Sequence, residues 1–372
     1  MDNFTETTTT SYGSNLMNSL KGIFFGFILL IGSIVLLSWN EGRSVNQADA
    51  LKEMSGNIVT LPDAKYDAAY EGKPVLVQGS INPVTELVDP LFGVKSKGLI
   101  LKRNVEMYQW TENKSSKSED KMGGSTETTT TYNYVKTWSN QQINSLDFNH
   151  PEGHANPSMV HQSHTFVTDA NIGDYYLSKS VVGHISTFEP YMGLSSLPDV
   201  VEDAKNLKSY LYIGDAPAVP KVGDMKISYK FAPSGKYSIA AESKNKALVS
   251  HQTINDRSFI FIRNGIVSAE QIFKDELESN KVLTWILRVV GLVLMFAAFS
   301  MMMSLLATLA KVIPFMGSLV GGATGIAAAV FTLILGSIVI AIAWFASRPL
   351  MSVAIIAVGF AIAIGLSKYK KN

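Results

Sequence analysis

Four histidines in the middle of the chain are the side chains whose type and spacing come nearest to a metal site: His150, His154, His161 and His164. Imidazole nitrogens bind metal ions, and the last two of these residues form a His-x-x-His pair. The chain has no cysteine, so no thiolate can complete such a site. A histidine pair alone is a weak signal, and histidines in surface loops are the more common alternative. We therefore expect no metal ion and no cofactor.

Acid–base and nucleophilic chemistry has equally few candidates. Glu106 and Glu112 share one predicted strand and could act as a carboxylate pair, although solvated strand carboxylates are more common. Ser158 follows Asn156-Pro157 and is more typical of a turn than of a nucleophile. The GxSxG, HExxH, GxGxxG and phosphate-binding loop motifs do not occur in the sequence. We therefore predict that the protein is not an enzyme.

The elements that would have to position these residues begin with membrane helices. Four long apolar runs lack charged residues, and about 20 such residues are needed to cross the hydrocarbon of a bilayer. The first run could instead be a cleaved signal peptide, but it is longer than such segments and no small-x-small cleavage site follows. We predict transmembrane helices at residues 22–39, 289–310, 319–347 and 350–367.

Residues 40–284, between the first two runs, have the composition of a β-rich domain. Alternating or β-branched segments predict its main strands at Lys73–Ser80, Leu99–Trp110, Thr126–Trp138 and Asp224–Phe231. Polar Asn113–Ser125 predicts a flexible hairpin tip, and Ser268 with Gln271 predicts a helix start. The fold class is therefore a multi-pass α-helical membrane protein with four spans and a large β-rich (α+β) extracytoplasmic domain.

The orientation of the spans is weakly encoded, because Lys and Arg are almost equally frequent near both ends of the predicted helices. The cluster Lys368–Lys371 favours a cytoplasmic C-terminus. Residues 1–20 then form a disordered cytoplasmic tail, residues 368–372 a basic cytoplasmic tail, and residues 40–284 lie outside. The net charge of +1 argues against a nucleic-acid partner.

Small residues recur every four positions in the third run, at Gly317, Gly321, Gly325 and Ala329, and Gly22-x-x-x-Gly26 repeats the pattern in the first. Such stripes allow close approach of helices. The contact could join copies of the chain into a homo-oligomer, or it could pack spans within one chain. The spans carry no ionisable residue in their interior, which lowers the probability of an ion-coupled transporter.

Charged residues also flank the spans on the side of the large domain. Asn40-Glu41-Gly42-Arg43 follows the first run, and Arg288 precedes the second. We predict that Glu41 pairs with an arginine, with Arg288 as the candidate, and fixes the domain to the membrane helices. The alternative is that these charges contact lipid headgroups and not one another.

A family resemblance rests on segments spread over most of the chain. The matching segments are Asn40-Glu41-Gly42-Arg43, Val105-Glu106-Met107-Tyr108-Gln109-Trp110, Tyr132, Tyr134, Trp138, Ile143-Asn144-Ser145, Phe148, Gly153-His154, Asn156-Pro157-Ser158, Val222-Gly223-Asp224, Thr284-Trp285, Leu287-Arg288 and Arg348-Pro349-Leu350. Through these segments the chain resembles the transmembrane protein 43 family, also called LUMA. The N-terminal tail and Asn113–Ser125 do not share the likeness.

The resemblance implies four spans, cytoplasmic ends and an extracytoplasmic domain, and it implies no catalytic residue. Animal members lie in the endoplasmic reticulum and inner nuclear membrane, with emerin and lamins as partners, whereas a bacterial protein would lie in the cytoplasmic membrane without them. We expect a non-enzymatic scaffold that self-associates and binds membrane lipid and an unknown membrane or extracytoplasmic protein. The alternative is a channel or lipid-handling protein.

Overall fold

The computed structural model describes residues 2–61, 63–345 and 349–369. These residues form two compact units. The β unit contains residues 2–4, 50–113 and 132–276, and the helical unit contains residues 5–49, 114–131 and 277–369 as far as they are described. Two long helices and one long hairpin therefore contribute to both units, and each unit is described below by itself.

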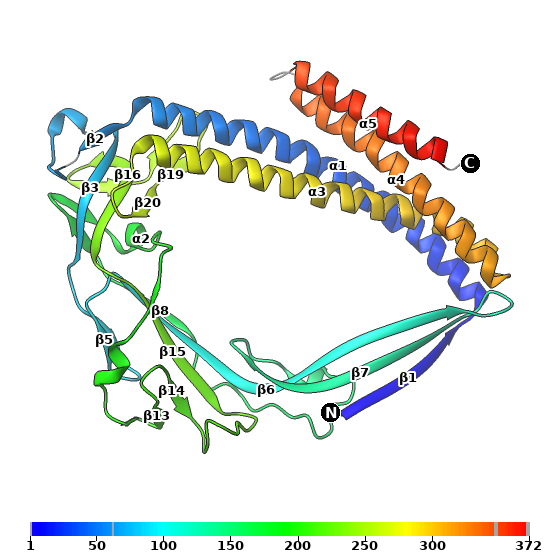
Figure 1. The fold of residues 1–372 in the computed structure, drawn as a ribbon, viewed down its shortest axis with the longest axis horizontal. Coiled ribbons are helices and arrows are strands. Elements are labelled where there is room, and N and C mark those ends of the chain that lie inside the picture. The colour runs from blue at the N-terminus through cyan, green and yellow to red at the C-terminus, as the bar shows by residue number, and fades with distance from the viewer. Residues whose placement is uncertain (1, 62, 346–348, 370–372) are drawn as a thin grey trace. The chain divides into compact units, whose positions relative to one another are not determined.

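Five helices are present in the described residues: α1 (Tyr12–Asn57), α2 (Lys179–Val182), α3 (Ala269–Ala310), α4 (Pro314–Trp344) and α5 (Pro349–Tyr369) (Figure 1). Of these, α1, α3 and α4 are long and apolar enough to cross a membrane. Helix α5 covers the fourth predicted span, but its described apolar stretch, Val353–Ile364, is shorter. Three possible spans are thus present among the described residues, and residues 370–372 of the predicted basic tail lie outside them.

Helices α1 and α3 continue well beyond their apolar parts. The 46 residues of α1 span about 69 Å at 1.5 Å per residue, more than twice the thickness of the hydrocarbon layer. The start of α3 is the predicted one, because the Ser268 hydroxyl accepts a hydrogen bond from the Gln271 amide at 3.2 Å. Buried Ile272 and Phe273 then hold this first turn against the β unit to which it belongs.

Within the helical unit, α1 and α3 run antiparallel. The Ser19 and Thr308 hydroxyls are 2.6 Å apart near one end, and Asn40 donates to the Thr284 carbonyl at 3.0 Å near the other. Helices α4 and α5 pack against each other (Figure 1). The core where α1, α3 and α4 meet is built from Leu37, Met295, Val339, Ile340 and Trp344. Most other apolar side chains of these helices are exposed or half-buried, as expected for a surface in contact with lipid.

The strands form two main sheets. The nine-stranded sheet has the order β1-β7-β6-β15-β14-β13-β12, with β8 on β6 and β11 on β15. Its strands are β1 (Asp2–Thr10), β6 (Ile100–Asp120), β7 (Thr126–Ser139), β8 (His164–Val167), β11 (Glu189–Pro190), β12 (Val200–Val201), β13 (Ala204–Asn206), β14 (Leu211–Ile213) and β15 (Met225–Ala232). The pairing of β6 with β15 is antiparallel and runs from Met225 opposite Met107 to Ala232 opposite Ile100.

The seven-stranded sheet has the order β2-β3-β9-β10-β17-β16-β20, and β3 also pairs with β16. Its strands are β2 (Val59–Leu61), β3 (Pro74–Pro83), β9 (Ala170–Ile172), β10 (Tyr175–Leu177), β16 (Gly235–Lys244), β17 (Ala247–Val249) and β20 (Phe261–Asn264). Two small ribbons pair β4 (Leu87–Asp89) with β5 (Val94–Ser96) and β18 (His251–Gln252) with β19 (Ser258–Phe259). Short 3-10 helices are η1 (Ala68–Tyr70), η2 (Ser145–Asp147) and η3 (Gly193–Ser196).

Each sheet of the β unit has its own apolar core. One cluster is centred on β3 and β16 and includes Val75, Val77 and Ile239. The other lies under β6 and β15 and includes Val105, Met107 and Ile227. The alternation of buried and exposed residues along β15 is the one that its sequence predicts. The β-rich character of this region is therefore confirmed.

Two expectations for polar segments differ from the structure. Asp2–Thr10 of the predicted disordered tail forms strand β1 beside β7, and α1 already begins at Tyr12. Strand β6 continues through most of the predicted flexible tip to Asp120. Threonine-rich segments have high β propensity, and cross-strand hydroxyl pairs such as Ser118 with Thr128, at 2.8 Å, add to the pairing. Composition alone did not reveal these partners.

The end of the β6–β7 hairpin belongs to the helical unit and contacts the connection between α3 and α4. The Gly123 amide donates to the Val312 carbonyl at 3.2 Å, and Lys311 pairs with Asp120 at 3.0 Å. The Asn15 side chain also donates to the Gly124 carbonyl at 3.0 Å. This contact lies at the end of α1 and α3 that is opposite to Asn40 and Arg288.

Candidate functional site

A buried ion pair joins α1 to α3 within the helical unit. Arg288 donates from Nε to Glu41 Oε1 at 2.6 Å and from Nη2 to Glu41 Oε2 at 2.7 Å. The Glu41 side chain is 0% exposed and that of Arg288 is 10% exposed. The planar guanidinium fork matches both carboxylate oxygens at once. The predicted partner of Glu41 is therefore confirmed as Arg288.

Further hydrogen bonds surround this pair. Arg43 donates to Asn280 Oδ1 and to Thr284 Oγ1, both at 3.0 Å. Asn280 in turn donates to the Ser44 carbonyl at 2.9 Å, and Asn40 donates to the Thr284 carbonyl. We call these seven residues the juxtamembrane node: Asn40, Glu41, Arg43, Ser44, Asn280, Thr284 and Arg288.

The sequence explains why these side chains meet. Asn280, Thr284 and Arg288 recur every four residues and so lie on one face of α3. Within the predicted motif, Gly42 is the one residue that does not belong to the node. A Cβ placed on it would meet nothing within 4 Å among the described atoms. No role for Asn280 was predicted from the sequence, although this residue lies four positions before Thr284.

Two tryptophans shield the charged end of the node. The Arg288 guanidinium carbon lies 4.8 Å from the Trp285 ring centre and 5.5 Å from that of Trp344 on α4. Cation–π contacts of this kind strengthen when water is excluded. What the node can do is hold α1, α3 and α4 in a fixed register at one end of their apolar parts.

Gly22 and Gly26 of the first span pack within the chain. A Cβ on Gly26 would lie 2.8 Å from the Ala298 carbonyl oxygen and 2.9 Å from Met302 Cγ. A Cβ on Gly22 would meet the Met301 carbonyl oxygen and the Ser304 hydroxyl, each at 3.6 Å. The crossing of α1 over α3 therefore depends on the missing side chain at Gly26.

The stripe on α4 is only partly in contact. A Cβ on Gly317 would lie 3.0 Å from Lys311 Cγ, and one on Gly321 would just reach Ala307 Cβ at 4.0 Å. Gly325 meets nothing within 4 Å in the described part of the chain, and Ala329 is half-buried. Three other glycines of the spans have closer neighbours than the stripe does, and they were not singled out from the sequence. They are Gly291 against Leu37, Gly336 against Leu292 and Gly359 against Ser337.

The four histidines do not converge on one point. His150 stacks on Phe4 with ring centres 4.4 Å apart, and His154 stacks on Tyr134 at 4.0 Å. His161 lies 3.7 Å from an Asp203 carboxylate oxygen, while His164 packs beside Phe166. Among the described residues, no group of three or more His, Asp or Glu side chains could hold a metal ion.

The two candidate carboxylates are also separate. Glu106 and Glu112 lie on one continuous strand, about 20 Å apart at 3.3 Å per residue. Burial opposes ionisation of Glu112, but hydrogen bonds from Tyr134 and Asn149 outweigh it and lower the pKa of the carboxyl. Burial and the bond to Glu112 raise the pKa of the Tyr134 phenol to about 12. This pairing orients an aromatic cluster, and Ser158 is exposed in a nearby loop.

A second buried charge pair, missed in the sequence, lies in the β unit. Asp89 is 0% exposed and accepts hydrogen bonds from Arg103 at 2.7 and 2.8 Å, from the Tyr229 hydroxyl at 2.6 Å and from the Leu91 amide at 3.0 Å. Burial, reinforced by the bond to Asp89, raises the pKa of the Tyr229 phenol, which therefore remains a donor. These bonds fix the β4–β5 ribbon against β6 and β15.

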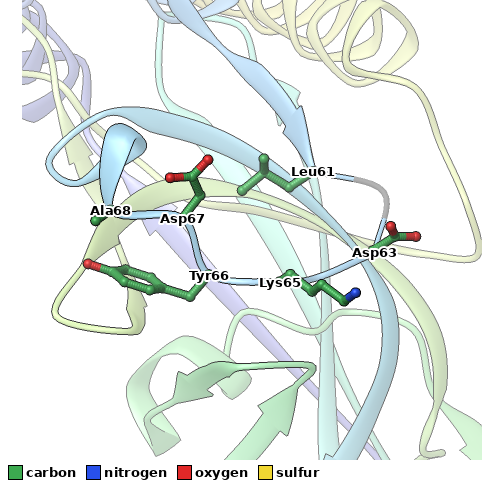
Figure 2. Close-up of a pocket in the computed structure, with 6 residues that line it drawn as sticks. All are labelled: Leu61, Asp63, Lys65, Tyr66, Asp67 and Ala68. Carbon is green, nitrogen blue, oxygen red and sulfur yellow. The ribbon is translucent and has the colours of Figure 1, made fainter.

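A cavity of the β unit is formed by the last residue of β2 and the short segment that follows this strand. Its lining residues are Leu61, Asp63, Lys65, Tyr66, Asp67 and Ala68 (Figure 2). Asp67 caps the N-terminus of η1, because its Oδ1 accepts a hydrogen bond from the Ala69 amide at 2.9 Å. Tyr66 donates to Glu71 at 3.1 Å. These contacts give a local structural role to the segment, and we assign no ligand to it.

Comparison with known proteins gives one consistent family. The family model described as Transmembrane protein 43 matches residues 107–349. Transmembrane protein 43 of Rattus norvegicus is 31% identical over 90% of this chain and 86% of its own length. The Homo sapiens protein is 31% identical over 91% and 88%, and the Drosophila melanogaster homolog is 28% identical over 90% and 91%. No solved structure matches the chain.

Proposed function

This chain belongs to the transmembrane protein 43 family of membrane proteins, and on that premise we propose that it is a non-enzymatic membrane scaffold. In this role it self-associates through its spans and binds a membrane or extracytoplasmic protein through its β unit. The single observation that carries the proposal is the juxtamembrane node. A buried ion pair with its hydrogen bonds makes a rigid helix junction, which suits a structural role.

The membrane part of the proposal uses the four apolar runs. Three described helices are long enough to span, and we propose that α5 together with its neighbouring residues forms the fourth span. The exposed apolar side chains of α1, α3 and α4 would contact lipid. Self-association is assigned to the open part of the α4 stripe around Gly325, because helices in lipid associate through small residues that allow close packing.

Two glycine substitutions separate contacts between chains from contacts within one chain. Gly325→Leu should shift the detergent-solubilised protein towards monomer at an unchanged melting temperature, because no described atom lies within 4 Å of its Cβ position. Gly26→Leu should lower the melting temperature, since its side chain would collide with Ala298 and Met302. Light scattering gives the mass and a thermal melt gives the stability.

The matched control is Gly322→Leu, which makes the same change on the same helix at an open position outside the stripe. It should alter neither mass nor melting temperature. Self-association through this stripe is refuted if Gly325→Leu leaves the mass of an oligomer unchanged, or if the unmodified protein is already a monomer.

The proposed topology places both ends of the chain in the cytoplasm and residues 40–284 outside it. Reporters inserted at Gly123 and fused at Asn372 should then report opposite sides of the membrane. The polar β6–β7 hairpin cannot lie in hydrocarbon, because its unpaired backbone groups would find no partner there. In the proposed topology, Gly123 and Val312 lie on opposite sides of a bilayer that surrounds α1 and α3. The hydrogen bond between their backbones could then not form in the membrane. Reporters on the same side would agree with that contact and refute the topology.

A further inference from the structure

Three successive residue pairs on one face of the nine-stranded sheet differ sharply in charge. Alternate residues of β6 and β15 share this face, and the pairs are Glu106 with Lys226, Asn104 with Ser228, and Lys102 with Lys230. The first pair is complementary and the second is neutral. The third places two lysines directly opposite each other in the strand register, and like charges at such positions destabilise a sheet unless something compensates them.

The strand on the other side of Lys102 provides no compensating charge. Thr165 of β8 is its direct neighbour there, and the Lys102 ammonium lies 3.7 Å from the Phe188 ring centre. Lys230 is exposed. Lys226, by contrast, has Glu106 opposite it and lies 4.8 Å from the Tyr210 ring centre. Positive charge is therefore left uncompensated at one point of the face.

A groove opens over this point. It has a volume of about 680 Å³ and is lined by both lysines together with Asn104, Thr165, Phe188 and Ser228. Every residue that lines it lies in the described part of the β unit, and none of them is Asp or Glu. Arg103 and His164 also line it, and Arg103 is already paired with Asp89. The groove thus combines two lysines that have no carboxylate partner in its lining, several hydroxyl and amide donors, and the Phe188 ring, on which the Lys102 ammonium lies.

We propose that this groove binds a phosphoryl group, either as a soluble phosphomonoester or as the headgroup of an anionic phospholipid. The two ammonium groups match the double negative charge of a phosphomonoester, and charge-assisted hydrogen bonds to phosphate are strong. The hydroxyls of Thr165 and Ser228 provide donors for oxygens that the lysines do not reach. Phe188 covers the first carbons of the esterified group. The site is independent of the scaffold role proposed above.

The test uses the full chain in nanodiscs of phosphatidylcholine, titrated with glycerol phosphate in a calorimeter. We expect saturable binding that weakens about tenfold for Lys102→Gln and about tenfold for Lys230→Gln, because each removes one charge-assisted bond. Lys236→Gln removes an equal charge from an exposed position on the other sheet and should leave the affinity unchanged. Binding that is absent, or equal in all four proteins, would overturn the proposal.

Two further measurements complete the test. In nanodiscs that contain phosphatidic acid, weaker apparent binding of glycerol phosphate identifies the lipid headgroup as the occupant, and unchanged binding identifies a soluble phosphomonoester. Without any ligand, Lys102→Gln should melt at the wild-type temperature or above it, because the like-charge pair is removed. A lower melting temperature would show that the two lysines are compensated within the fold, and it would contradict the premise of the site.

Discussion

Replacing Glu41 with Gln is expected to lower the free energy of unfolding of the helical unit by about 3–5 kcal/mol, because it leaves the buried Arg288 cation without its carboxylate. The side chain keeps its shape, so the loss reports the charge and not a cavity. Arg288 has only 10% of its side chain exposed and cannot turn to water without disturbing Trp285 and Trp344. Unfolding in mixed detergent micelles measures the effect.

The double variant Glu41→Leu/Arg288→Met should recover most of that stability, since replacing both partners of a buried pair by apolar groups is often neutral. Asp49→Asn removes a carboxylate from an exposed position of the same helix and serves as the control. If Glu41→Gln were no more destabilising than Asp49→Asn, the node would be a solvated pair of little consequence. The proposed scaffold role, which rests on a rigid junction at this node, would then be unsupported.

A loss of about 3–5 kcal/mol is also expected in the β unit for Asp89→Ala, which leaves the Arg103 guanidinium and the Tyr229 hydroxyl without their buried acceptor. The ribbon of β4 and β5 should detach from the sheet. Hydrogen exchange of the amides in β5, β6 and β15 follows this region separately from the membrane helices. Faster exchange there, with unchanged exchange in α1 and α3, is the expected pattern.

Tyr229→Phe removes one of the donors to Asp89 and should cost about 0.5–1.5 kcal/mol, clearly less than the loss of the carboxylate. Asp199→Asn provides the control, because Asp199 is exposed and pairs with Lys208 at the surface. Equal exchange in Asp89→Ala and Asp199→Asn would show that this buried pair does not hold the ribbon.

The sequence was informative wherever local pattern decides structure. Uncharged apolar runs marked the helices, and the alternation along Asp224–Phe231 marked β15 to within one residue at each end. Capping chemistry located the start of α3 at Ser268. The ion pair of Glu41 with Arg288 was also predictable, because two opposite charges at the same edge of adjacent spans have few other partners.

By itself the sequence determined the membrane class, the family and the β-rich insertion, because hydropathy, composition and likeness are properties of the chain. Apart from the pair of Glu41 with Arg288, only the tertiary structure decided which of the site residues meet. It paired Asp89 with Arg103 and Tyr229 and set Lys102 opposite Lys230. It also packed Gly26 closely against another helix and left Gly325 without a close neighbour among the described residues. The physical reason is that strand register and helix crossing are long-range properties. They follow from packing between segments that lie far apart in the sequence, 289 residues for Ser19 and Thr308, which no local pattern encodes.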